Sequence, residues 1–191
     1  MQVSANSLKV GNIIEYNNKL WVVAKPPVHT KPGKGGAFIQ AELKEILSGT
    51  KLNERFRSDE NVERVRLEQK DFQFLYPEGE NLHFMNMESF EQLELPSKLL
   101  EEKAAFLQEN MPVVIEFHEE RALSVRLPDT VTLLITEADA VIKGQTVTSS
   151  YKPAILENGM RVLVPPFISS GERIVVKTED CSYVERAKNG N

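Results

Sequence analysis

One lysine in a run of glycines is the residue of this chain most open to chemistry with a partner. Lys34 follows Gly33 and precedes Gly35 and Gly36, so no neighbouring side chain shields its ammonium. Glycine also lets a backbone approach another molecule closely. A Schiff-base lysine needs a pocket or a nearby cation to lower its pKa, and a glycine-flanked tip supplies neither. The spacing therefore favours presentation of a charge over covalent catalysis.

The histidines, the cysteine and the paired acids do not form a recognisable catalytic site. His118 precedes two glutamates, as in a zinc-protease helix, but Ala122 stands where the second histidine is needed. With Cys181 as the only cysteine and three scattered histidines, we expect no metal site and no cofactor. Gly36 stands where a phosphate-binding P-loop needs a serine or threonine. We therefore expect a protein that is not an enzyme.

Composition places the chain among globular proteins. It has 191 residues, 41% of them hydrophobic and 27% charged, with a mean hydropathy of −0.32. No apolar run approaches the roughly 20 residues that cross a bilayer, and the first residues lack the pattern of a secretory signal. One cysteine cannot form an intrachain disulfide. We expect a cytoplasmic protein with no membrane segment.

Charge is distributed unevenly along the chain. Residues 1–64 carry 10 Lys and Arg against 7 Asp and Glu, residues 65–127 carry 6 against 13, and residues 128–191 carry 7 against 8. No acid lies between Glu15 and Glu42, whereas four lysines do. This stretch predicts a local positive field, so an anionic partner is expected at one end of the chain only.

The first third predicts a small sheet with a projecting loop. Strands are expected at 12–16, 20–24, 37–46 and 51–57, with Asn17 and Asn18 as a two-residue hairpin turn. Residues 25–36 contain three prolines and three glycines, so we expect no regular structure there. If they project as a hairpin, the tip lies about 18 Å from the sheet.

The remaining two thirds predict two further barrels and one helix. Strands are expected at 71–76, 82–85, 113–117 and 123–127, then at 131–136, 152–156, 161–164 and 173–178. The alternating Phe72, Phe74 and Tyr76 are expected in a core, and residues 97–110 predict an amphipathic helix. The fold class is therefore all-β, with three small β-barrel domains at 1–64, 65–127 and 128–191.

Four motifs, in order and in register over nearly the whole chain, resemble bacterial translation elongation factor P of the type with a lysine at the loop tip. They are Lys31-Pro-Gly-Lys-Gly-Gly-Ala-Phe38, Gly49-Thr-Lys51, His83-Phe-Met-Asn86 with Phe90-Glu-Gln-Leu93, and Lys152-Pro-Ala154 with Gly159, Val162, Val164-Pro165, Ile168 and Gly171. The resemblance implies a KOW/SH3-like barrel followed by two OB-folds, with an elongated, tRNA-like shape.

The same resemblance implies a function and partners. A factor of this family binds the 70S ribosome between the P and E sites, beside the peptidyl-tRNA, and relieves stalling at consecutive prolines. No membrane partner is implied, and we expect a monomer.

Site residues also follow from the resemblance. The loop near the CCA end of P-site tRNA would comprise Lys31, Pro32, Gly33, Lys34, Gly35 and Gly36. Lys34 would be the target of a lysine-modifying enzyme, through β-lysylation. Gly144, Gln145 and Thr146 would form the loop beside the E-site codon, although the family typically has Asp where this chain has Gln145. Tyr183 and Arg186 would lie near the P-site tRNA.

Two other function classes stay open at this point. A generic OB-fold RNA-binding protein needs basic and aromatic residues interleaved on an exposed sheet face. A lysine-dependent enzyme would give a borohydride-trapped adduct with carbonyl compounds.

Overall fold

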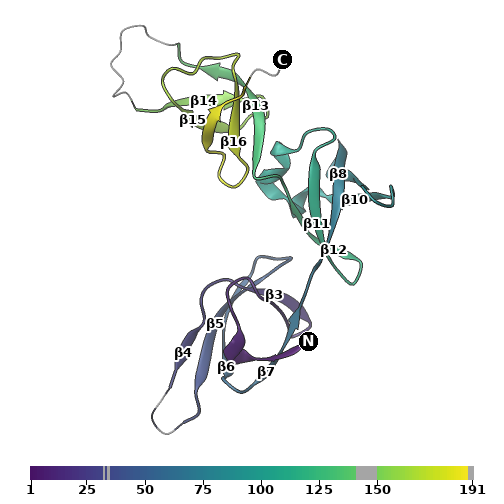
Figure 1. Cartoon of the computed structure of the whole chain (residues 1–191), viewed down its shortest axis with the longest axis vertical. Helices are drawn as coiled ribbons and strands as arrows, with labels where there is room; N and C mark the ends of the chain where they lie inside the picture. Colours follow the sequence, from purple (N-terminus) through teal and green to yellow (C-terminus); the bar gives the residue numbers. More distant parts are fainter. Residues whose placement is uncertain (32, 34, 141–149, 189–191) are drawn as a thin grey trace. The chain divides into compact units, whose positions relative to one another are not determined.

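The computed structural model describes residues 1–31, 33, 35–140 and 150–188, most of which form three antiparallel sheets (Figure 1). The first sheet has the strand order β1-β7-β2-β3-β5-β4, and β6 also pairs with β5. Its strands are β1 (Gln2–Ser4), β2 (Ile13–Tyr16), β3 (Lys19–Val23), β4 (Val28–Thr30), β5 (Phe38–Glu45), β6 (Lys51–Arg57) and β7 (Asn61–Val65).

The predicted hairpin between β2 and β3 is confirmed. Tyr16 pairs with Lys19, and the two residues between them, Asn17 and Asn18, have φ values of 52° and 58°. Positive φ at both central positions is the conformation of a type I′ turn, whose twist matches that of the flanking strands. The turn sets the register of the hairpin, and Trp21 Nε1 donates a hydrogen bond to the Tyr16 carbonyl oxygen at 2.9 Å.

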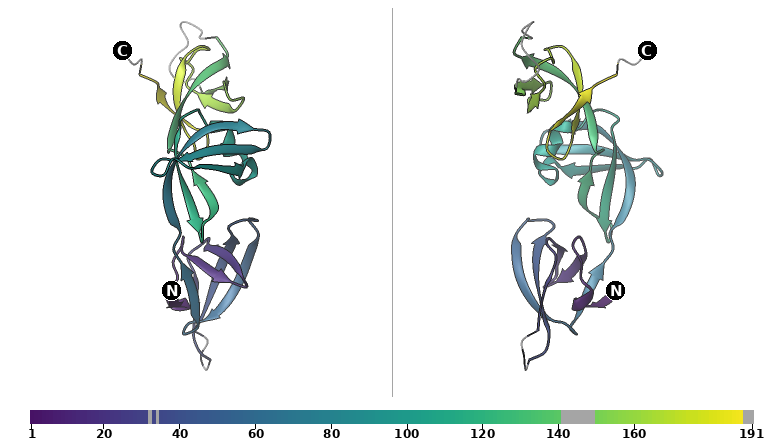
Figure 2. Two further views of the ribbon diagram at one scale, coloured as in Figure 1. Left: turned by 90° about the vertical axis from the view of Figure 1, so that its right-hand side faces the viewer. Right: turned by 60° about the vertical axis from the view of Figure 1, so that its left-hand side comes forward.

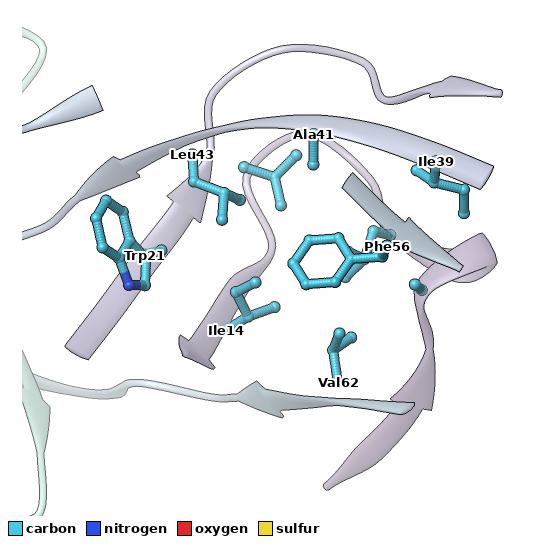
Figure 3. Close-up of a cluster of buried hydrophobic side chains, with 10 residues drawn as sticks. Ile14, Trp21, Ile39, Ala41, Leu43, Phe56 and Val62 are labelled. Carbon is cyan, nitrogen blue, oxygen red and sulfur yellow. The ribbon is translucent and has the colours of Figure 1, made fainter. Parts of the chain in front are cut away.

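One side of the first sheet encloses a hydrophobic core (Figure 3). Alternation along β5 turns Ile39, Ala41 and Leu43 inward, and all three are fully buried. Phe56 of β6 meets the edge of the Tyr16 ring at a centroid distance of 5.5 Å. The core is completed by Ala5, Leu8, Ile14, Trp21, Val23 and Val62.

The projecting loop contains a strand that the sequence did not predict. The expectation of no regular structure at 25–36 is wrong for β4, in which His29 pairs with Ile39 and Thr30 with Phe38. The reason is tertiary: β5 offers a free edge, and backbone pairing to it outweighs the weak local preference of β4. Strands β1, β7, β10 and β17 were not predicted either.

The second sheet has the order β10-β9-β8-β11-β12. Its strands are β8 (Glu68–Glu78), β9 (Asn81–Asn86), β10 (Gln92–Pro96), β11 (Pro112–His118) and β12 (Arg121–Arg126). The Phe74 and Phe84 rings meet edge to face at 5.5 Å within its core. Five antiparallel strands with one helical insertion between the third and fourth agree with the predicted OB-type arrangement.

The helix predicted at 97–110 is two short 3₁₀ segments instead, η2 (Ser97–Leu99) and η3 (Glu101–Phe106). Glu101 has a φ of 53°, which breaks a continuous α-helical ladder between them. Of the predicted apolar face, Leu100 is buried, whereas Ala104 and Leu107 are only half-buried; Phe106, which lies outside that face, reaches the core instead.

The expectation that all three alternating aromatics enter the core is wrong for Tyr76. Phe72 and Phe74 are buried, whereas Tyr76 is 47% exposed. The β8–β9 ladder pairs Phe74 with Phe84 and Tyr76 with His83, so Leu75 is an extra residue on β8. Such a bulge shifts the side-chain alternation and redirects the residue that follows it.

The third sheet has the order β15-β14-β13-β16-β17. Its strands are β13 (Thr130–Ala138), β14 (Lys152–Leu156), β15 (Arg161–Val164), β16 (Arg173–Lys177) and β17 (Tyr183–Arg186). A bulge between Ile135 and Glu137 bends β13, and β15 contacts β17 from the opposite end of the order. The curl of the strands within each sheet is visible in Figure 2.

The chain divides into two compact units, residues 1–69 with 116–123, and residues 70–115 with 124–191. Within the second unit, Gln108 Nε2 donates to the Thr132 carbonyl at 2.9 Å and Asn158 Nδ2 donates to the Ala105 carbonyl at 3.0 Å. These bonds join η3 and the residues that follow it, which are inserted between β10 and β11, to the third sheet. The all-β class is confirmed, while the domain boundaries near residues 64 and 127 stay a prediction.

Across the described ranges, no helical segment has the length and apolar character that a membrane crossing requires.

Trp21 gives a probe for the stability of the first unit, because it is the only tryptophan in the chain and lies in that core. We expect Phe56→Ala to lower the unfolding free energy by about 3–5 kcal/mol, since it leaves a cavity. Urea unfolding followed by Trp21 fluorescence measures this. Phe84→Ala, a cavity of the same size in the second unit, should leave the Trp21 transition in place. Equal shifts from both variants would show that the units unfold together.

Candidate nucleic-acid interface

The loop at residues 31–37 is carried by a two-stranded ribbon. Among the described residues, β4 is exposed along its length and pairs with β5 alone, while β5 is held in addition by β3 and β6. The last ladder pair before the loop is Thr30 with Phe38. β5 therefore fixes both ends of the loop, because Phe38 belongs to it and Thr30 pairs with Phe38. The ribbon of β4 and β5 leads the chain away from the sheet (Figure 1).

The described loop residues leave space around the tip. Lys31, Gly33, Gly35 and Gly36 are exposed. A Cβ built on Gly33 or Gly36 would meet no atom within 4 Å, so neither glycine is required by crowding inside the protein. Their lack of side chains instead leaves room for a partner. Pro32 and Lys34 lie outside the described residues.

Two of the four lysines in the acid-free stretch are paired with acids from β5. Lys25 Nζ lies 2.7 Å from Glu42 Oε2, and Lys19 Nζ lies 3.2 Å from Glu45 Oε2. The hydrogen bond from Lys25 lowers the pKa of the Glu42 carboxyl. The pKa of Glu45 is also lowered, first by the Ser48 hydroxyl and then by Lys19. These two ion pairs weaken the positive field that the sequence predicts, at the end of the stretch where Lys19 and Lys25 lie.

Additional cations lie on the outer face of β5 and β6, and sequence reasoning missed them. Lys44, Lys51, Arg55 and Arg57 are all exposed, and alternation places them on the face opposite the core. Arg57 pairs with Phe38 at the loop end of β5, and the Arg55 guanidinium lies 4.0 Å from the centre of the Phe38 ring. The available signal was that the basic residues of β6, at 51, 55 and 57, are separated by even numbers of residues and therefore share one face of the strand. We call these four residues the outer basic row.

Tyr183 and Arg186, singled out from sequence, both lie on β17. Arg186 is already engaged: Nε lies 3.1 Å from Glu172 Oε1, Nη2 donates to the Phe167 carbonyl at 3.0 Å, and the guanidinium covers the Phe167 ring at 4.9 Å. Tyr183 meets Tyr151 edge to face at 6.4 Å, and burial raises the pKa of its hydroxyl. The strand thus presents an oriented guanidinium and one half-buried aromatic ring, Tyr183, beside the exposed rings of Tyr151 and Phe167.

The other predicted site residues are distributed as follows. Gly144, Gln145 and Thr146 lie outside the described residues. The loop at 31–37 belongs to the first compact unit, and Tyr183 and Arg186 belong to the second. His83 Nε2 lies 2.9 Å from Glu78 Oε2, and the described part of the chain holds no cluster of three His, Cys, Asp or Glu placed to bind a metal ion.

Three family models match consecutive parts of the chain. The model described as "Elongation factor P (EF-P) KOW-like domain" matches residues 4–62, "Elongation factor P (EF-P) OB domain" matches residues 67–125, and "Elongation factor P, C-terminal" matches residues 131–186. Each match coincides with one of the three sheets.

Curated relatives are similar over almost the full length. Elongation factor P of Brucella suis is 58% identical over 98% of this chain and 100% of the relative. That of Bartonella bacilliformis is 59% identical over 97% of both. A solved structure of "Eukaryotic translation initiation factor 5A from Methanococcus jannaschii" has a TM-score of 0.54 at 24% identity, covering 67% of this chain and 92% of that one. At this identity the likeness concerns the fold alone.

The pairing of Lys25 can be tested by titration. Lys25→Met removes the hydrogen bond that lowers the pKa of Glu42, so that pKa should rise toward its ordinary value. Because the folded-state pKa is lowered, the stabilisation is present above the ordinary carboxyl pKa and is lost as pH falls through the lowered value. Carboxyl ¹³C NMR measures the change, with Lys9→Met as a control. An unchanged Glu42 pKa in Lys25→Met would contradict the pairing.

Proposed function

The chain belongs to the elongation factor P family, and we propose that it binds the 70S ribosome between the P and E sites and stimulates peptide-bond formation at consecutive prolines. Membership makes it a translation elongation factor and not an enzyme. The observation that carries the proposal is the β4–β5 ribbon, which fixes Thr30 and Phe38 at the two ends of the glycine-rich loop whose sequence contains Lys34. The proposal also takes the factor to be a cytoplasmic monomer.

The proposed action of the tip is positioning. Proline is a rigid secondary amine, and a run of prolines holds the peptidyl ester in a poor geometry for attack. Correct orientation of reacting groups is worth on the order of 7–11 kcal/mol in the most favourable intramolecular reactions. A cationic arm beside the CCA end of P-site tRNA restores alignment, while the ribosome supplies the chemistry.

Extension of Lys34 by a modifying enzyme suits the local sequence. An aminoacylating enzyme must reach the Lys34 amine, and glycines on both sides leave its approach free of side chains. β-Lysylation lengthens the arm and keeps a positive charge at its end. The arm then combines reach with attraction to the tRNA backbone.

The outer basic row fits the same role. Arg55 and Arg57 are two residues apart on one strand, so their side chains leave the sheet about 6.6 Å apart on the same face. Cations in such a row neutralise successive phosphates and release counterions. By contrast, the acidic middle third repels RNA, which keeps binding confined to particular surfaces.

The proposal assigns the third sheet to the P-site tRNA and the E-site codon. Arg186 is held by Glu172 and Phe167 with its guanidinium half exposed, which suits contact with a phosphate or a base. In the loop at Gly144–Gln145–Thr146, Gln145 replaces the carboxylate typical of the family with an amide. An amide donates as well as accepts hydrogen bonds, so its interactions with the codon would differ there.

The central test uses translation of a three-proline reporter in an extract depleted of the endogenous factor. We expect Lys34→Ala to abolish rescue without a change in stability, because exposed loop substitutions alter it by no more than about 0.5 kcal/mol. Lys34→Arg should also fail, since a guanidinium cannot be acylated in the same way. Lys9→Ala, an exposed lysine outside the loop, is the control. Full activity from either Lys34 variant would refute the assignment of Lys34 as the functional arm.

The outer basic row predicts a change in salt dependence. Replacing Arg55 and Arg57 together by Gln should weaken binding to ribosomes that carry P-site tRNA, and should reduce the log–log salt slope by about 0.7–0.9 for each phosphate that is no longer neutralised. Filter binding at low and at physiological salt measures both. The double variant Lys98→Gln, Lys103→Gln removes two exposed charges from the acidic third and should leave the slope unchanged. Equal slopes in all three proteins would exclude the row from the interface.

A further inference from the structure

Tyr76 is an exposed aromatic that the fold holds in place. The bulge at Leu75 turns it out of the core, and 47% of its surface is exposed. Its ring stacks on His83 with centroids 4.6 Å apart and planes inclined by 21°. His83 is in turn fixed by Glu78, whose Oε2 lies 2.9 Å from Nε2. An aromatic ring ordered in this way binds a partner with little loss of side-chain entropy.

Tyr76 lines a groove of about 420 Å³ between β8 and the η3 segment. The buried side chains of Phe74 and Leu82 contribute to its lining from the core. Ala104 and Leu107, three residues apart in or just after η3, line the other side. The neighbouring Ala105 and Gln108 bond to the third sheet instead, so the two sides of this segment have separate roles. Leu75 and Pro77 complete the apolar lining.

The charge around the groove is negative. Among the described residues that line it, Glu109 alone is charged. Exposed glutamates also occur on η3, at Glu101 and Glu102, where they outnumber the exposed Lys103, and in the β8–β9 hairpin at Glu78 and Glu80. The whole stretch 65–127 carries 6 basic residues against 13 acidic ones. Such a surface repels phosphates and attracts cations.

We propose that this groove of the second sheet binds a basic segment of a ribosomal protein, which inserts an apolar side chain between β8 and η3 and places a lysine or arginine against Tyr76. The apolar lining favours an aliphatic or aromatic insertion. A cation over a tyrosine ring is attracted by its negative face, and Glu109 adds a carboxylate at the same place. RNA fits poorly because it offers phosphates to an acidic rim. The inference rests on the proposed function only in locating the partner on the ribosome.

Photo-crosslinking identifies the occupant directly. The full chain with p-benzoylphenylalanine in place of Tyr76 is bound to purified 70S ribosomes and irradiated, and the products are analysed by mass spectrometry. We expect a crosslink to a ribosomal protein, within a peptide rich in lysine and arginine. A crosslink to ribosomal or transfer RNA, to a second copy of the factor, or to an acidic peptide would overturn the proposal, and so would the absence of any crosslink.

Affinity measurements give an independent readout. Tyr76→Ala should weaken ribosome binding by about 2- to 30-fold, the range expected from a cation–aromatic interaction, and Glu109→Lys should also weaken it, because it places a like charge against the proposed cation. Phe90→Asn is the matched control, because Phe90 is 67% exposed in the β9–β10 turn of the same sheet, and asparagine tolerates its φ of 61°. Thermal unfolding checks that all three variants fold. Unchanged affinity in Tyr76→Ala and Glu109→Lys, or equal loss in Phe90→Asn, would overturn the groove assignment.

Saturation separates failure of the groove proposal from failure of the proposed function. Tyr76→Ala should recover full rescue of the three-proline reporter at high factor concentration, since only affinity is lowered. Lys34→Ala should show no rescue at any concentration. If Tyr76→Ala binds normally while Lys34→Ala is inactive, the groove proposal alone fails. If Lys34→Ala is active while Tyr76→Ala binds weakly, the groove stands and the role of the tip fails.

Discussion

The register of β5 is the constraint on which the first unit depends. β5 pairs with β3, β4 and β6, and its inward residues Ile39, Ala41 and Leu43 are fully buried. A slip of one residue would turn all three to solvent and bring charged neighbours into the core. The same register fixes Thr30 opposite Phe38, and therefore the point where the loop leaves the sheet. Core packing thus determines where the two ends of the loop leave the sheet, because the buried Ile39 directly follows Phe38.

Local signals were sufficient for much of the fold, and they failed where tertiary pairing decides. The pair Asn17-Asn18 predicts its hairpin because the turn conformation is a property of those two residues. β4 has no such signal, since three exposed residues become a strand only because β5 has a free edge. At Tyr76 the alternation was read correctly through Phe74, but a bulge is a property of the ladder between two strands and leaves no mark in either sequence alone.

The candidate site divides in the same way. The glycines around Lys34 and the motifs shared with elongation factor P point to the tip from the sequence alone. The pairing of Lys25 with Glu42, seventeen residues further along the chain, depends on the position of β5, so the sequence alone overestimated the free positive charge. The groove at Tyr76 required β8 and η3 to be brought together, and no motif records that packing.

The proposed role of the factor is to align the peptidyl-tRNA without taking part in proton transfer, and the pH dependence of a single round of peptide-bond formation tests this most directly. The rate on ribosomes carrying a peptidyl-prolyl-tRNA is measured from mildly acidic to mildly alkaline pH, with and without the modified factor. Alignment predicts that the fold-enhancement stays constant while the underlying rate changes with pH. An enhancement that grows as a single group of the factor loses its proton would show that an amine of the arm acts as a base, and would contradict a role in alignment alone.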